Sequence, residues 1–197
     1  MDWIKFTGLV MVVCFALINL IFLFRKNESF FNLRDVVKDH LYLFYDCKSQ
    51  YIVFYFSPLL FAVGLALIYE AGETFYTNLS VIVSVLLSML LAILSILTGK
   101  DYSCISDDDQ RENIQTVTQE TITAIVFDSL LCIFLLLYGL AMIVIDGVDF
   151  DTEIIKRVFA GVAYYNFAVT LLNLLLIVKR MSRIIEFDFS VQKENQK

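Results

Sequence analysis

The sequence has few charged residues, one histidine and one proline. Only 18% of its 197 residues are charged, whereas 59% are hydrophobic and 15% are aromatic. Soluble domains carry about 25% charged residues, so this composition excludes an ordinary soluble globular protein. It indicates a protein that lies largely within a membrane.

The hydrophobic residues gather in five runs, each about twenty residues long. A helix of that length crosses the ~30 Å hydrocarbon core of a bilayer at 1.5 Å per residue. The segments between the runs are too short for a separate catalytic domain, so we expect no enzyme activity. The sequence predicts an all-α fold, a polytopic membrane bundle that forms a single domain. Its five transmembrane helices would be residues 3–24, 51–69, 79–99, 124–145 and 158–178.

Lys and Arg are distributed unequally between the two sides of this arrangement. Most of them lie in the first loop, the third loop and the tail. Cytoplasmic loops are enriched in Lys and Arg, so we expect the N-terminus outside and the C-terminus in the cytoplasm. The first run is longer than the apolar part of a signal peptide and is followed by Arg25 and Lys26 instead of small residues. We therefore expect it to be retained as a helix.

Groups that support metal or redox chemistry are scarce. The four cysteines have no metal-binding spacing and fall within predicted spans or cytoplasmic loops, where thiols stay reduced. The single histidine, His40, has no second imidazole to act with. Asp107, Asp108 and Asp109 lack the pattern of a calcium loop and suit the start of a helix. We expect no catalytic residue, metal or cofactor.

A short amphipathic helix is expected in the first cytoplasmic loop. Between residues 32 and 45, apolar side chains recur at helical spacing with charged side chains on the opposite face. Asn32 is suited to cap this helix, and His40 should lie along its edge. The helix could lie on the membrane surface and guide the chain into the second span, or it could bind a partner.

A second helix is expected to project from the membrane on the cytoplasmic side. The segment from Asp109 to Thr123 contains neither Gly nor Pro, which predicts one long helix that continues into the fourth span as a cytoplasmic extension. Ile114, Val117 and Thr121 form an apolar stripe on it, which some neighbour must cover. That neighbour could be another copy of the chain.

Small and polar side chains form stripes on two of the predicted spans. Such residues let helix backbones approach closely, and their polar atoms bond across helices or back to their own turn. We interpret both stripes as helix-packing or oligomer contacts, the alternative being the lining of a water-filled path. The stripes are Ser80, Ser84, Ser88, Ala92 and Ser95 on the third span, and Ala163, Asn166, Thr170 and Asn173 on the fifth.

Asp128 is the one acid well inside an apolar run. A carboxylate at the centre of a span costs roughly 2.5–3.5 kcal/mol, and less near the interface. Asp128 could reach the headgroups, or it could face a cavity or a partner such as Asn173 or Lys179. A proton or ion relay would need several ionisable groups in series, so a transporter is poorly supported.

The tail, residues 184–197, differs in pattern from the spans. Residues 185–191 alternate apolar and polar side chains with a period of two, which predicts a β-strand. A single strand needs a sheet to join. We therefore hypothesise that Ile185, Phe187, Phe189 and Val191 add to the sheet edge of a cytoplasmic partner. The alternative is a disordered tail that touches the membrane surface through its aromatic residues.

The order of these features resembles a known family. The amphipathic stretch 31–50, which runs into Tyr51-Ile-Val-Phe-Tyr-Phe-Ser-Pro58, the Leu-rich third span, and the segments 115–140 and 164–180 are similar to the membrane subunit of the bacterial Kiwa anti-phage defence system. The resemblance implies a multi-pass inner-membrane protein that contacts lipid and forms a homo-oligomer, a tetramer. It also implies recruitment of a cytoplasmic DNA-binding partner subunit without direct contact to nucleic acid, and signalling of phage attack at the envelope.

The short outward loops suggest how such a protein would sense phage. They are too small to form a receptor, so we expect sensing through the bilayer, whose thickness or curvature affects the tilt of packed helices. Two other classes of function are considered. The oligomer could be a pore that depolarises the cell, with Asn166, Thr170 and Asn173 lining it. A small-solute transporter would need inverted repeats, which the five unequal spans do not show.

Overall fold

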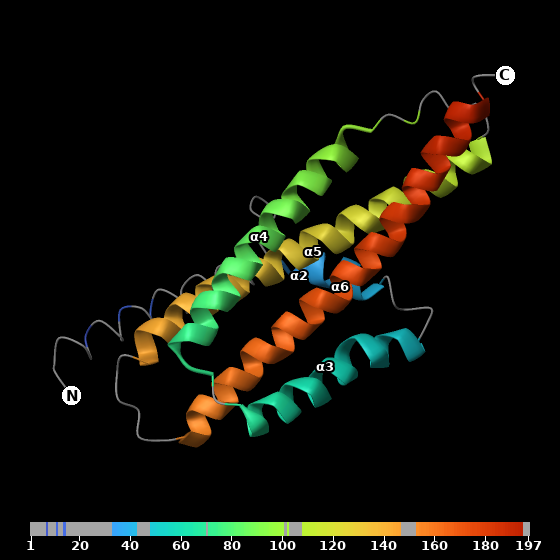
Figure 1. The fold of residues 1–197 in the computed structure, drawn as a ribbon. Coiled ribbons are helices and arrows are strands. Elements are labelled where there is room, and N and C mark those ends of the chain that lie inside the picture. The colour runs from blue at the N-terminus through green and yellow to red at the C-terminus, as the bar shows by residue number, and fades with distance from the viewer. Residues whose placement is uncertain are drawn as a thin grey trace.

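A computed structural model describes Thr7, Met11, Cys14, Tyr102 and residues 33–42, 48–69, 71–100, 108–146 and 153–194. Over these ranges every regular element is a helix, as the sequence predicts (Figure 1). Most of the first predicted span lies outside the described residues, as do Asn32 and residues 195–197. The helices are α2 (Leu33–Tyr42), α3 (Lys48–Ile68), α4 (Glu73–Thr98), α5 (Asp108–Asp146) and α6 (Glu153–Glu194).

The two longest helices, α5 and α6, form the centre of the fold and run antiparallel to each other (Figure 1). Helix α4 packs on α5, α3 packs on α6, and the short α2 also packs on α5. The main buried core lies between α4, α5 and α6. A smaller core of Ala62, Ala160 and Tyr164 joins α3 to α6.

Within the described residues, three helices are long and apolar enough to cross a membrane, namely α4, α5 and α6. The apolar part of α3, Ile52–Ile68, is shorter than such a span. The structure therefore supports a membrane protein with three helices of this kind, which is fewer than the five spans predicted. Large hydrophobic side chains such as Ile82, Leu137 and Leu175 are exposed on the outer faces of these three helices, as expected of helices in lipid.

Helix α5 confirms the prediction of one unbroken helix that starts near Asp109. It runs for 39 residues and has Asp108 and Asp109 in its first turn, where their charge complements the positive end of the helix dipole. Its length is about 58 Å at 1.5 Å per residue. Because the hydrocarbon core is only ~30 Å thick, α5 must extend well beyond it.

The predicted strand at residues 185–191 is wrong, because α6 continues as a helix to Glu194. Ile177 and Ile184 are fully buried, and Phe187 packs against the same core. These three positions follow helical spacing and face α5. Continuing an existing helix adds one hydrogen bond per residue, whereas a single strand leaves its backbone groups unpaired. The period-two pattern was therefore a misleading signal.

Candidate functional site

Beyond their apolar segments, α5 and α6 continue side by side as a pair, which we call the polar extension (residues 108–123 and 179–194). Ile114 and Thr121 are buried there and Val117 is half-buried. Ile184 and Phe187 of α6 pack into the same core. The apolar stripe of the predicted cytoplasmic helix is thus covered largely by α6 of the same chain.

Three polar contacts between residues far apart in sequence fix the position of the polar extension. One joins the end of α4 to α6, one joins α5 to α6, and one joins Tyr102 to α5. The contacts are the Lys100–Asp188 ion pair, the Glu120–Arg180 ion pair at 3.1 Å, and the Tyr102 Oη to Thr118 Oγ1 contact at 2.9 Å. Ion pairs that water can reach contribute about 0–1 kcal/mol each, so they set the register of the helices more than their stability.

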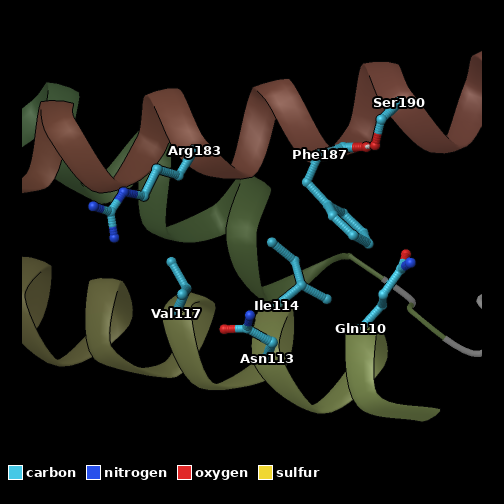
Figure 2. A pocket seen from close by; sticks show the side chains of 7 residues that line it. All are labelled: Gln110, Asn113, Ile114, Val117, Arg183, Phe187 and Ser190. Carbon is cyan, nitrogen blue, oxygen red and sulfur yellow. Dashed lines mark hydrogen bonds between the residues drawn. The ribbon is translucent and has the colours of Figure 1, made fainter. Parts of the chain in front are cut away.

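An open groove of about 410 Å³ lies between the two helices of the polar extension (Figure 2). Phe187 points from α6 toward Ile114 and Gln110 on α5. The side chains that line the groove are Gln110, Asn113, Ile114, Val117, Arg183, Phe187 and Ser190. One of these seven is charged, Arg183, and none is acidic. Among the described residues, the groove therefore combines apolar surface with a single positive charge.

The groove includes only some of the residues predicted to bind a partner. Ile114, Val117 and Phe187 line it, whereas Ile185 and Phe189 are exposed elsewhere on α6, with Phe189 67% exposed. Thr121 is buried, and Val191 lies near the end of α6.

Sequence reasoning missed the polar residues of the groove, above all Arg183 and Asn113. The signal that could have found them is helical periodicity. Arg183, Phe187 and Ser190 are spaced four and three residues apart on α6, and such residues share one face of a helix.

A second polar cluster, which we call the buried junction, lies where α2, α5 and α6 meet. Asp128 on α5 is 0% exposed, and His40 on α2 and Asn173 on α6 are each 1% exposed. The His40 ring stacks on Phe127, with ring centroids 3.9 Å apart and planes 5° from parallel. The Asn173 side chain lies close to both His40 and Asp128. Of the alternatives left open for Asp128, the structure shows a position facing Asn173.

His40 is buried, so the expectation that it lies along the edge of its helix is wrong. Its burial lowers the pKa of the ring to about 4, with a smaller lowering effect from the positive charge of Arg180 and an opposing effect from Asn173. The ring is therefore neutral at pH 7. A neutral, stacked imidazole lets α2 pack against α5 without placing a charge in the core.

Several buried polar atoms of the apolar region make no hydrogen bond within the part of the chain that the structure describes. They include both carboxyl oxygens of Asp128, both amide atoms of Asn173 and the Thr170 hydroxyl. A buried polar group without a partner costs about 1–3 kcal/mol. Polar groups that are kept inside a membrane protein at such a cost are candidates for a functional role.

The serine stripe of α4 lies mostly on an exposed face. Ser84, Ser88, Ala92 and Ser95 are exposed, whereas Ser80 is half-buried beside Gly139. The hydroxyls of Ser80, Ser84 and Ser88 donate to carbonyl groups of their own helix. Within one chain the stripe is therefore not the main surface that packs on α5, and contact with a second copy stays a prediction.

The polar stripe of α6 behaves differently from the serine stripe. Thr170 and Asn173 are buried, and so is Ala163. Asn166 is half-buried and donates to the carbonyl oxygen of Val162 in its own helix. The side chains of this stripe thus pack largely against other helices of the same chain.

No protein-family model, curated protein or solved structure matches this chain. Among the described residues, no group of three or more His, Cys, Asp or Glu side chains is placed to hold a metal ion.

Proposed function

We propose that this chain is a membrane-embedded scaffold and sensor subunit that binds a cytoplasmic protein and acts without catalysis. The observation that supports this most strongly is the groove in the polar extension. Helices α4, α5 and α6 supply the anchor in the membrane. The groove combines apolar side chains with one cation, and such a mixture is common where proteins bind each other.

The proposed topology has the C-terminus in the cytoplasm of a bacterial cell and the protein in the inner membrane. The distribution of Lys and Arg supports this orientation. Lys179 and Arg180 directly follow the apolar segment of α6, where they would lie near anionic headgroups, and Arg183 lies about one turn further along the helix. In this arrangement residues 3–24 and α3 would complete five spans, and the groove would face the cytoplasm.

The proposed setting is an anti-phage defence complex of the Kiwa type. The support is the resemblance of the sequence to the membrane subunit of that system. The partner would then be the cytoplasmic DNA-binding subunit, and the membrane subunit would act as a tetramer. The exposed serine stripe of α4 is the surface that would best allow close contact between copies.

The proposed sensing mechanism uses the continuity of α5. A change in bilayer thickness or curvature alters the tilt of membrane helices, and α5 connects its membrane segment to the groove without a break. A tilt of α5 relative to α6 would therefore change the width of the groove. Such small shifts between packed helices are an established means of signalling.

Photocrosslinking in cells tests the proposed recruitment. A photoreactive amino acid replaces Ser190, which lines the groove, or, as a matched control, Ser84, which is exposed on α4. We expect the probe at position 190 to crosslink to one soluble polypeptide and the probe at position 84 to crosslink only to lipid or to a second copy. Absence of any polypeptide at position 190, together with reporter fusions that place the C-terminus in the periplasm, would refute the proposal.

A pore-forming effector is the second candidate. The observation that favours it is the set of buried polar atoms without hydrogen bonds at Asp128, Thr170 and Asn173, because water in a path would satisfy them. Purified protein in vesicles would then conduct ions, and Asn173→Leu would abolish the current. The scaffold proposal instead predicts that vesicles containing the protein remain impermeable to ions.

A further inference from the structure

We infer that the groove of the polar extension binds a short acidic and apolar segment of a cytoplasmic protein, with a carboxylate at Arg183 and an apolar side chain against Phe187. This inference rests on the proposed function, because it names the chemistry of the segment that the recruited partner presents. Four observations support it: the charge of the groove, its apolar surface, its rim and its distance from the membrane.

The charge of the groove is positive in a chain that is negative overall. The chain has a formal net charge of −6, yet among the described residues that line the groove the one charged side chain is Arg183. Arg183 is exposed and has no ion pair among the described residues, whereas neighbouring Arg180 is paired with Glu120. Arg180 also repels Arg183 electrostatically. A carboxylate from a ligand would relieve this repulsion and supply Arg183 with a bidentate partner.

The apolar surface of the groove fits one side chain of a peptide. Phe187 is half-buried and points across the groove toward Ile114 (Figure 2). Val117 lines the groove on the same helix as Ile114. An inserted Leu, Ile or Phe would contact all three and would remove their remaining surface from water.

The rim offers a polar group for the backbone of the segment. Asn113 is exposed at the rim of the groove. Its amide can both donate and accept a hydrogen bond, as a peptide group requires. The Ser190 hydroxyl, in contrast, already donates to the Phe187 carbonyl oxygen.

The distance of the groove from the membrane favours a protein segment over a lipid headgroup. At 1.5 Å per residue, Val117 and Phe187 lie about 10 and 14 Å beyond the ends of the predicted spans at residues 124 and 178. The headgroup layer on each side of a bilayer is only about 5–8 Å thick. The apolar part of the groove thus lies beyond the headgroups, where a soluble protein can reach it.

A peptide-display experiment tests this inference. A random heptapeptide library on phage is selected against the full chain in nanodiscs of phosphatidylcholine, and the Kd of each enriched peptide is then measured by fluorescence anisotropy. We expect enriched peptides to combine Asp or Glu with Leu, Ile or Phe. Enrichment of basic or purely polar peptides, or no enrichment at all, would overturn the inference.

Matched variants show where the peptides bind. Arg183→Glu should weaken binding at least tenfold, and a peptide whose acid is replaced by Lys should restore it. Lys179→Glu, an exposed position on the same helix that does not line the groove, should change the Kd less than twofold. Phe187→Ala should likewise weaken binding at least tenfold, whereas Phe189→Ala should not. Equal effects at test and control positions would contradict the assigned site.

Two further results separate this inference from its rivals. If phosphatidylglycerol in the nanodiscs displaces the peptides and Arg183→Glu removes that effect, the groove is a lipid site and the inference fails. If position 190 crosslinks to a cytoplasmic protein but no acidic peptide binds, the inference fails while recruitment stands. A periplasmic C-terminus without a crosslinked polypeptide removes recruitment itself.

Discussion

In the polar extension, Glu120 of α5 meets Arg180 of α6 in an ion pair that water can reach. Two turns further along α5, Asp128 faces Asn173 of α6 with no exposed surface, and its carboxyl oxygens make no hydrogen bond within the described part of the chain. The same two helices thus treat acidic residues in opposite ways. In the polar extension the acidic side chain has an opposite charge and contact with solvent, whereas in the buried junction it has a neutral amide as its neighbour and no solvent.

The difference indicates that the two ends of the α5–α6 pair have different roles. The Glu120–Arg180 pair, with side chains 40% and 14% exposed, keeps contact with water, and partly exposed ion pairs contribute little to stability, which suits a region close to a surface that binds another molecule. Buried polar groups without partners raise the free energy of the packed state, which suits a region that can change its arrangement. The buried junction also contains His40 of α2, a short helix that packs on α5 and places this ring near Asn173 and Arg180 of α6.

The largest expected effect is a loss of α2 docking at low pH. His40 has a pKa of about 4 when docked, against 6.5 for the free ring. Undocked α2 therefore binds the proton more readily, so docking weakens as pH falls from 6.5 to 4, by up to about 3 kcal/mol, and is unaffected above that window. Hydrogen exchange of residues 33–42, corrected for its intrinsic pH dependence, measures this loss.

His40→Phe provides the control for the pH experiment. The substitution keeps an aromatic ring on Phe127 but removes the titrating group. Exchange of α2 should then be independent of pH between 6.5 and 4. If the variant lost protection as the wild type does, groups other than His40 would control docking.

The second expected effect concerns packing in the apolar region. A Cβ atom on Gly139 would lie 2.9 Å from the Ser80 hydroxyl oxygen, so Gly139→Leu should force α4 away from α5. Overpacking of this kind costs about 1–3 kcal/mol. Gly64→Leu is the matched control, because nothing lies within 4 Å of a Cβ atom there. Thermal unfolding in detergent should show a lower midpoint for the first variant alone.

The third expected effect is an increase in stability, whereas the first two are losses. Asp128→Leu removes a buried carboxyl that makes no hydrogen bond to any described residue, so it should raise the free energy of unfolding by roughly 1–2 kcal/mol. If the junction takes part in sensing, the variant should still insert and bind its partner but should fail to protect cells. A loss of stability would instead show that Asp128 has a favourable partner, and the contrast between the two regions would disappear.

The sequence predicted the elements with local signals better than it predicted their contacts. The continuity of α5 could be predicted because Asp109 marks its start and no Gly or Pro interrupts its first four turns. The helical end of α6 was missed because Ile185, Phe187 and Phe189 match a strand pattern. Their true state depends on the stripe of α5, which lies far away in sequence.

The candidate site depended even more on long-range contacts. The burial of His40 requires α2 to pack near Phe127, and the groove requires Arg183 and Asn113 to lie on facing helices. No local pattern specifies this register. The sequence does suggest Asn173 as a neighbour of Asp128, because both are polar and share the inner half of their predicted spans, where a polar group needs a neighbour.

The smallest expected effect lies in the polar extension. Lys100→Ala breaks the ion pair with Asp188. The two side chains are 22% and 38% exposed, so we expect the free energy of unfolding to fall by about 0.2–1 kcal/mol. A double-mutant cycle with Asp188→Ala isolates the coupling, and 1 M salt should reduce it because the pair is screened. A coupling above 2 kcal/mol would mean that the polar extension is held as firmly as a core. In that case the Lys100–Asp188 pair would hold α6 firmly against the end of α4, and a partner would have to bind the groove without any movement of α6.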